Sequence, residues 1–244
     1  MFPEDTLYAY EHSMAMGGDV VDIDVLLSAD DIPIAFHDGT LQRTTNGVGN
    51  VEDKTYAQLA TLDAGYNFVQ NGQHPYRGKG LTIPTVQAIL ETFPHSLVTL
   101  DLKDLRVAAV QPLCSLLETL HRTRDVFIGV DSAAQVLDFR KQCPEVHTSG
   151  TDADRQAMRA ARATNDPNYV SPQIVSQPEY LPTNSTRRIT AESLAYSHRK
   201  GVAVLTWVVD DPATMKALIG MGIDGIYTRR PDVMLAVLQQ MGLR

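Results

Sequence analysis

The sequence predicts an α/β fold in which a parallel sheet is closed into a (β/α)8 barrel of the TIM type, as one domain over residues 1–244. Short apolar runs rich in β-branched residues alternate with longer runs of helical period along the whole chain. This alternation indicates parallel strands joined by helical crossovers, and nearly continuous apolar strands indicate that both faces are covered. An open doubly wound sheet also satisfies the pattern, but about 250 residues and about eight strand–helix units favour the barrel.

The predicted elements alternate in chain order. The strands are Val20–Leu26, Ile34–Phe36, Leu97–Leu102, Val126–Val130, Tyr169–Val175, Val202–Val208 and Gly225–Tyr227, with Glu145–Thr148 as a further short candidate. The helices are Leu7–Met16, Tyr56–Leu62, Thr85–Phe93, Val107–Arg122, Ala133–Gln142, Asp152–Ala163, Ala191–Lys200, Pro212–Met221 and Pro231–Met241. Thr85, Thr190 and Asp211 stand where N-caps belong, and Gly222 stands where a helix C-terminal glycine belongs. The stretch His37–Pro84 is largely loop, and long loops in compact domains tend to be functional.

The composition excludes some classes of function. The formal net charge is −8, which argues against nucleic acid as the main partner, because phosphate backbones are bound by clustered Lys and Arg. A small anionic substrate at one local site stays compatible with this charge. No apolar run is long enough for a transmembrane helix, and the N-terminus lacks the features of a signal peptide. The compartment is unknown, with a soluble cytoplasmic protein as the default, and the sequence does not indicate the oligomeric state.

The two cysteines give no sign of a pair. Cys114 and Cys143 lie far apart, and neither belongs to a CxxC motif. Cys114 falls in an apolar helical run, which is typical of a core position. We therefore expect no disulfide bond.

Two acids stand on one predicted strand. Asp22 and Asp24 are two residues apart, so their side chains share one face of the strand. Two carboxylates on one face of a buried strand repel each other unless a positive charge compensates. A hard divalent cation is the simplest compensation, because Mg²⁺ and Ca²⁺ prefer carboxylate oxygens. The alternative is an exposed edge strand with solvated acids.

Two further strand ends carry candidate functional residues. His37 and Asp38 follow an apolar strand, at the end where barrel enzymes keep their chemistry, and such a histidine can act as general acid or base. Asp101 and Lys103 share a face of the next strand, where they can form a third metal ligand and a cationic contact for a phosphate oxygen. The alternatives are a loop histidine and an ordinary ion pair.

Taken in order, these segments resemble the glycerophosphodiester phosphodiesterase family. The matching segments are Pro3–Thr6, Gly18–Val25, His37–Gly49, Leu100–Lys103, Trp207–Asp210 and Gly222–Asp232. Each motif is weak to moderate by itself, but together they cover nearly the whole chain in the family's order. The resemblance implies a TIM-type barrel and metal-dependent hydrolysis of a glycerophosphodiester or lysophospholipid, in lipid metabolism, to a glycerol phosphate-type product and an alcohol.

The resemblance also implies roles for particular residues. It implies Asp22, Asp24 and Asp101 as ligands of Mg²⁺ or Ca²⁺, His37 as one of two catalytic histidines, Lys103 as a phosphate contact, and Glu4 and Trp207 as substrate-binding residues. Trp207 is the only tryptophan, so a core position is the alternative for it.

The chain departs from the family pattern at several positions. Asp22 and Asp101 stand where Glu is more common, Arg229 stands where Asp is usual, and Asp210 stands where Asn is usual. We expect Arg229 to reverse a charge near the barrel mouth. The family pattern begins with a strand that ends in His-Arg-Gly, whereas this chain starts inside the following linker. We therefore expect the first strand and the second catalytic histidine to be missing, either by truncation or in a shortened homologue that binds metal or phosphodiester without turnover.

Overall fold

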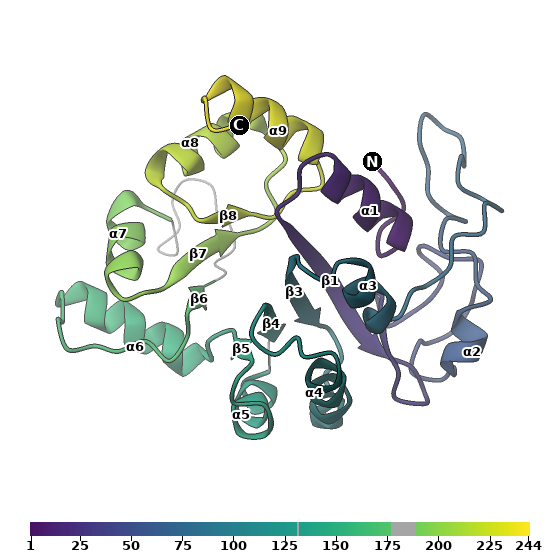
Figure 1. Ribbon diagram of the computed structural model, residues 1–244, viewed down its shortest axis with the longest axis horizontal. Coiled ribbons are helices and arrows are strands. Elements are labelled where there is room, and N and C mark those ends of the chain that lie inside the picture. Colours follow the sequence, from purple (N-terminus) through teal and green to yellow (C-terminus); the bar gives the residue numbers. More distant parts are fainter. Residues whose placement is uncertain (131, 177–188) are drawn as a thin grey trace. The chain divides into compact units, whose positions relative to one another are not determined.

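The computed structural model describes residues 1–130, 132–176 and 189–244, which belong to two compact units, Met1–Val146 and His147–Arg244 (Figure 1). In each unit strands and helices follow one another along the chain, with two consecutive strands and then two consecutive helices in the first unit. Within the ranges given above, no helix has both the length and the apolar character that a bilayer crossing requires.

The first unit carries the elements that position the candidate site. They are α1 (Leu7–Ala15), β1 (Val20–Leu27), β2 (Pro33–Ala35), α2 (Tyr56–Leu59), α3 (Val86–Thr92), β3 (Leu97–Leu102), η1 (Val107–Ala109), α4 (Val110–Thr119), β4 (Val126–Val130) and α5 (Ala133–Gln142). The predicted bounds of β3, β4 and α5 are confirmed. The single helix predicted over Val107–Arg122 instead begins with the 3₁₀ turn η1 and ends at Thr119.

Strands of the first unit lie in the order β2-β1-β3-β4, with β1 beside β3 (Figure 1). The β1–β3 and β3–β4 pairs are parallel, as predicted. The β1–β2 pair is antiparallel, so the prediction of an all-parallel sheet is wrong at this edge. Only residues 28–32 join these two strands, and a connection this short permits a hairpin but no helical crossover. The Ser28 side chain stabilises the turn, because its hydroxyl accepts a bond from the backbone N–H of Ile32 and donates one to Asp30.

The main core of the first unit lies between this sheet and its helices. Ile23, Leu100 and Ile128 come from β1, β3 and β4 and are fully buried, and they belong to one cluster with Ile89 of α3 and Leu113 of α4. A second cluster lies under the long segment 37–84. It consists of Leu26, Ile34, Phe36, Leu41, Val51, Leu59, Ala64 and Ile83. The predicted loop is therefore a packed segment with its own apolar core, which gives its polar side chains fixed positions.

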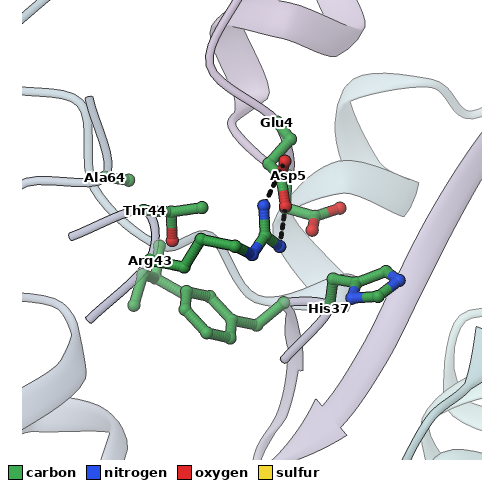
Figure 2. A pocket seen from close by; sticks show the side chains of 8 residues that line it. Glu4, Asp5, His37, Arg43, Thr44 and Ala64 are labelled. Carbon is green, nitrogen blue, oxygen red and sulfur yellow. Dashed lines mark hydrogen bonds and ion pairs between the residues drawn. The ribbon is translucent and has the colours of Figure 1, made fainter. Parts of the chain in front are cut away.

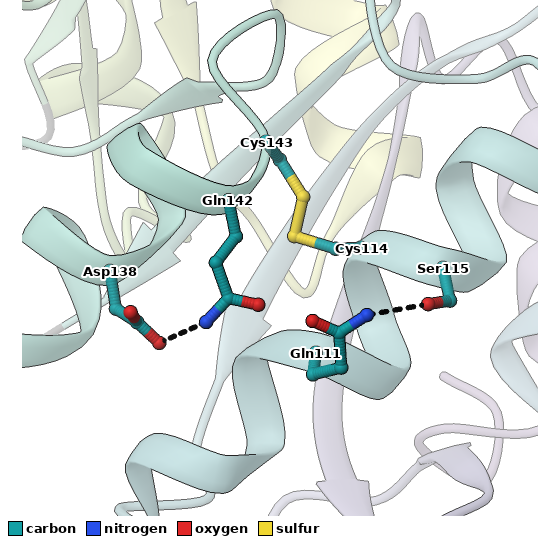
Figure 3. The surroundings of a disulfide bond; sticks show 6 residues. All are labelled: Gln111, Cys114, Ser115, Asp138, Gln142 and Cys143. Carbon is teal, nitrogen blue, oxygen red and sulfur yellow. Dashed lines mark hydrogen bonds between the residues drawn. A yellow bond between two sulfur atoms is a disulfide. The ribbon is translucent and has the colours of Figure 1, made fainter.

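A disulfide joins α4 to the residue after α5, so the prediction of no disulfide is wrong (Figure 3). The Cα atoms of Cys114 and Cys143 are 6.0 Å apart, and both residues are buried. The bond is possible because α4 and α5 pack against each other. A separation of 29 residues in the sequence gives no sign of that proximity.

The second unit repeats the strand–helix pattern. Its elements are β5 (His147–Thr148), α6 (Asp152–Ala163), β6 (Val175–Ser176), α7 (Ala191–Arg199), β7 (Ala203–Thr206), α8 (Pro212–Met221), β8 (Gly225–Ile226) and α9 (Pro231–Gln240). Strands β6, β7 and β8 form parallel pairs. The strand predicted over Tyr169–Val175 begins only at Val175, because Pro172 has no N–H to donate and the Ser171 hydroxyl bonds the Gln173 carbonyl in a local turn.

The predicted helix ends are confirmed at four positions. The Thr85, Thr190 and Asp211 side chains accept bonds from backbone N–H groups in the first turns of α3, α7 and α8. Gly222 ends α8 in the left-handed conformation, with φ of 89°, which a residue without Cβ adopts freely. These local signals explain why so many predicted bounds agree with the structure.

Candidate active site

Strands β1 and β3 place three acidic side chains on one face of the sheet. Residues at alternate positions of β1 point to opposite faces, so the same pleat that buries Val21 and Ile23 turns Asp22 and Asp24 to the other face. In the parallel register, Asp22 lies opposite Thr99, and Asp24 lies opposite Asp101. The prediction that the two acids of β1 share a face is confirmed. The pairing of β1 with β3 places a third acid, Asp101, on the same face.

Lys103 lies between two of these acids. Its Nζ is 2.5 Å from Oδ2 of Asp101 and 3.3 Å from Oδ1 of Asp24. Desolvation acts to lower the pKa of Lys103, but the hydrogen bond and charge of Asp101 and the charge of Asp24 outweigh it and raise that pKa. The ion pair expected as the ordinary alternative is present, and it places a positive charge among the carboxylates.

One ammonium leaves this face with excess negative charge. Asp22 is exposed at its surface, but protein atoms surround much of the carboxylate, and this desolvation raises its pKa to about 7. The hydrogen bond that the Thr99 hydroxyl donates at 2.5 Å acts in the opposite direction and lowers that pKa. Desolvation also raises the pKa of Asp24, while the positive charge of Lys103 acts in the opposite direction. Asp5 adds a carboxyl whose pKa is well above its ordinary value through burial and the charge of Asp24. Such a group of acids favours a bound cation.

The donor atoms fit a hard cation by their chemistry. Asp22, Asp24 and Asp101 offer only carboxylate oxygens, which Mg²⁺ and Ca²⁺ prefer over nitrogen and sulfur. In the part of the chain that the structure describes, no three His, Cys, Asp or Glu side chains already stand in the arrangement of a metal site. The support for a cation therefore comes from donor chemistry and uncompensated charge.

The β1–β2 hairpin brings His37 to the edge of this face. The Phe36 backbone N–H bonds the Asp24 carbonyl at 2.9 Å, so the residue that follows stands close to the acids. The sequence placed His37 at the carboxyl end of a parallel strand; in the structure it arrives by an antiparallel return instead. The ring is half-exposed, and its Nδ1 lies 2.7 Å from Oδ1 of Asp38. This arrangement leaves Nε2 available for proton transfer.

Arg43 joins the His37 region to the start of the chain. Its guanidinium bonds Asp38 on one side and Glu4 on the other, and Arg43, Glu4 and His37 line one narrow pocket with Asp5, Phe36, Thr44, Ala64 and Ile83 (Figure 2). The structure thus places Glu4 and His37 on the lining of one pocket. Sequence reasoning missed Arg43 as a site residue, although the arginine is part of the segment His37–Gly49 that carried the resemblance.

Three predicted residues belong to the second unit, which is described by itself. Trp207 follows β7 and is 45% exposed, so the alternative of a core position is wrong. The Arg229 guanidinium and backbone N–H both bond the Asp210 carboxylate, with the Nε–Oδ2 distance at 2.7 Å. The positive charge of Arg229, which stands where the family usually has Asp, is therefore neutralised by Asp210, which stands where the family usually has Asn.

Comparison with known proteins shows which family the chain matches. The family model described as "Glycerophosphoryl diester phosphodiesterase family" matches residues 1–233. A glycerophosphodiester phosphodiesterase of Caldanaerobacter subterraneus subsp. tengcongensis is 26% identical over 98% of this chain and 94% of its own length. The structure of a glycerophosphodiester phosphodiesterase from Agrobacterium tumefaciens is 25% identical, with a TM-score of 0.76, over 97% of this chain and 94% of that one.

A further solved structure is similar in fold. An Oleispira antarctica phosphodiesterase in complex with the product sn-glycerol-3-phosphate has a TM-score of 0.76 and 22% identity, over 98% of this chain and 92% of that one. These likenesses confirm the predicted fold class, an α/β fold of the TIM-barrel type. Among the residues that the structure describes, hydrogen-bonded strands form two sheets and not one continuous ring.

Proposed function

The chain belongs to the glycerophosphoryl diester phosphodiesterase family, and from that premise we propose that it hydrolyses a glycerophosphodiester or a lysophospholipid to a glycerol phosphate-type product and an alcohol. It is a phosphoric diester hydrolase by the family and the relatives that it matches. The observation that carries the finer proposal is the face of β1 and β3, where Asp22, Asp24 and Asp101 gather and Lys103 pairs with Asp24 and Asp101. His37 lies at the edge of this face.

Three carboxylates are the proposed ligands of a divalent cation, Mg²⁺ or Ca²⁺. Asp22, Asp24 and Asp101 supply the hard oxygen donors, and desolvation together with the neighbouring carboxylates raises the pKa values of Asp22 and Asp24, a cost that a bound cation would offset. When bound, such an ion neutralises charge on a phosphate oxygen. Lys103 then becomes the second positive group of the site, and its ammonium can turn from Asp101 to a phosphate oxygen.

His37 is the proposed proton-transfer group. The oxygen of an attacking water molecule bonds to phosphorus as the water gives a proton to Nε2 of His37, and the phosphorus–oxygen bond to the leaving alcohol breaks. The leaving oxygen takes a proton from solvent water and departs as the alcohol, and His37 returns its proton to solvent. Asp38 faces Nδ1 and stabilises the positive charge that the ring gains. Trp207 is the proposed substrate-binding residue of the second unit, since the residue is 45% exposed.

The test is hydrolysis of glycerophosphocholine and of lysophosphatidylcholine in Mg²⁺, Ca²⁺ or EDTA. We expect EDTA to abolish turnover, and Asp24→Asn and His37→Gln each to lower it by about 10² to 10⁴-fold. Asp138→Asn, on α5, removes a carboxylate that bonds only Gln142 among the contacts described and serves as the matched control. Turnover that survives EDTA or Asp24→Asn would contradict the metal site. Bound metal without turnover of either substrate would favour the non-catalytic alternative.

A further inference from the structure

We propose that Arg43 is a positioning residue, which clamps Asp38 between itself and His37 and thereby sets the orientation and tautomer of the His37 ring. The inference rests on the proposed function only in the role of His37 as the proton-transfer group. It also reassigns Glu4, from a substrate contact to the anchor that holds the Arg43 guanidinium in place.

The hydrogen bonds of Arg43 leave it little capacity for substrate. Its Nε and Nη2 bond Asp38 at 2.5 and 3.1 Å, and its Nη1 and Nη2 bond Glu4 at 2.9 and 2.5 Å. A guanidinium has five N–H donors, and these contacts engage all three of its nitrogens. An arginine that bound the substrate phosphate would have to release one of two carboxylates first. The geometry therefore indicates that Arg43 bridges the carboxylates of Asp38 and Glu4.

Asp38 transmits the position of Arg43 to the histidine. Its Oδ1 faces both Nη2 of Arg43 and Nδ1 of His37, the latter at 2.7 Å. The hydrogen bond from Arg43 is the main reason that the pKa of Asp38 is lowered, so this carboxyl stays ionised at neutral pH. An ionised carboxylate only accepts, so Nδ1 of His37 carries the proton and Nε2 of the neutral ring keeps its lone pair. A base with its lone pair on Nε2 is what the proposed reaction uses.

Glu4 holds the other side of the guanidinium from a fixed position. It lies two residues before Thr6, whose hydroxyl donates to the Pro3 carbonyl at 2.7 Å and whose side chain caps α1. Both carboxylate oxygens of Glu4 are engaged by Arg43 (Figure 2). Because Glu4 and Arg43 are 39 residues apart, this contact ties the first segment of the chain to the long segment that carries His37.

Steady-state kinetics with the full chain separate a positioning role from a substrate contact. We expect Arg43→Gln to lower kcat by about 10- to 100-fold, as partners of functional histidines do, with KM changed by less than about twofold. Arg43→Lys keeps the charge but lacks the planar fork, so it should recover only part of kcat. The control is Arg124→Gln, which removes the ion pair of Arg124 with Glu145. Arg124 lies just before β4, and we expect its substitution to leave kcat and KM unchanged. A rise in KM at constant kcat would overturn the proposal in favour of phosphate binding by Arg43.

The tautomer of His37 gives a second readout that needs no turnover. In ¹⁵N-histidine-labelled protein, with His37→Gln to assign the signals, we expect the proton on Nδ1 in the wild type. Asp38→Asn and Arg43→Gln should both shift the population toward Nε2–H, and Glu4→Gln should give a smaller shift. An unchanged tautomer in folded Arg43→Gln protein would overturn the proposal, and Arg43→Lys serves if Arg43→Gln does not fold. If no phosphodiester is hydrolysed, the proposed function fails while this measurement still decides the role of Arg43.

Discussion

At the scale of single residues, Asp210 and Arg229 show how two departures from a family pattern can be one feature. Taken alone, Arg229 predicts a reversed charge near the barrel mouth, and Asp210 predicts a mild change from an amide to an acid. In the structure each is the other's partner, and the Thr228 hydroxyl also bonds Asp210 at 3.1 Å. The pair restores local neutrality, so substitution of either residue by itself should destabilise the second unit more than substitution of both together.

Asp210 also gives a prediction for the dependence of stability on pH. Desolvation acts to raise the pKa of Asp210, but bonds from the Arg229 backbone and guanidinium and from Thr228 outweigh it and lower that pKa from 3.8. A carboxyl with a lower pKa in the folded state stabilises the fold above its unfolded pKa and loses that contribution as pH falls through its folded pKa. Asp210→Asn should therefore lower the free energy of unfolding by about 1 kcal/mol at neutral pH, with the difference shrinking below pH 3.8.

Urea unfolding of wild type and Asp210→Asn across this range measures the effect. In an Arg229→Gln background the difference should be smaller but not zero, because the backbone N–H of residue 229 and the Thr228 hydroxyl remain. A stability difference that is the same at neutral and acidic pH would show that the carboxylate charge is not its cause.

At the scale of elements, the β1–β2 hairpin and the disulfide shape the first unit. The hairpin turns the chain back after β1, so His37 reaches the acids of β1 without a helical crossover. The disulfide connects the two helices that follow β3 and β4 (Figure 3). The hairpin constrains the edge of the sheet that presents Asp24 and Asp101. The disulfide constrains the helices that pack on that sheet.

The disulfide should contribute to stability through the loop that it closes. Because Cys114 and Cys143 are separated by 29 positions in the sequence, loop closure in the unfolded chain corresponds to about 3 to 4 kcal/mol. Reduction should lower the free energy of unfolding by about that amount, as measured by urea denaturation with and without dithiothreitol. The Cys114→Ala/Cys143→Ala variant should be less stable than wild type and insensitive to the reductant. Two titratable thiols in the unreduced, denatured protein would contradict the bond.

At the scale of the whole molecule, charge is the property that links the site to the fold. The chain has a formal net charge of −8, and several of its acids gather on the face of β1 and β3. The self-repulsion of these acids costs folding free energy, and Lys103 offsets only part of it. A cation at this face should therefore stabilise the folded protein as well as serve the reaction.

Calorimetry or thermal unfolding tests that linkage without measuring activity. We expect Mg²⁺ or Ca²⁺ to raise the Tm, by the equivalent of about 2.7 kcal/mol when the cation is at about a hundredfold excess over its Kd, and EDTA to reverse the rise. Asp24→Asn should remove most of the effect, whereas Asp138→Asn should retain it. If neither cation changes the Tm of the wild-type protein, the proposed ligands do not form a binding site.

The sequence by itself determined the α/β alternation, most element bounds, the caps and the shared face of Asp22 and Asp24, because these follow from periodicity and from neighbours within a few residues. Only the tertiary structure decided the antiparallel return of β2, the bond between Cys114 and Cys143, the bridge of Arg43 from Glu4 to Asp38, and the pairing of Asp210 with Arg229. The antiparallel return depends on how a short turn is closed, and the other three depend on where the chain brings residues together. A local pattern records the direction of a side chain, but its partner across the fold is set by the path of the backbone between them.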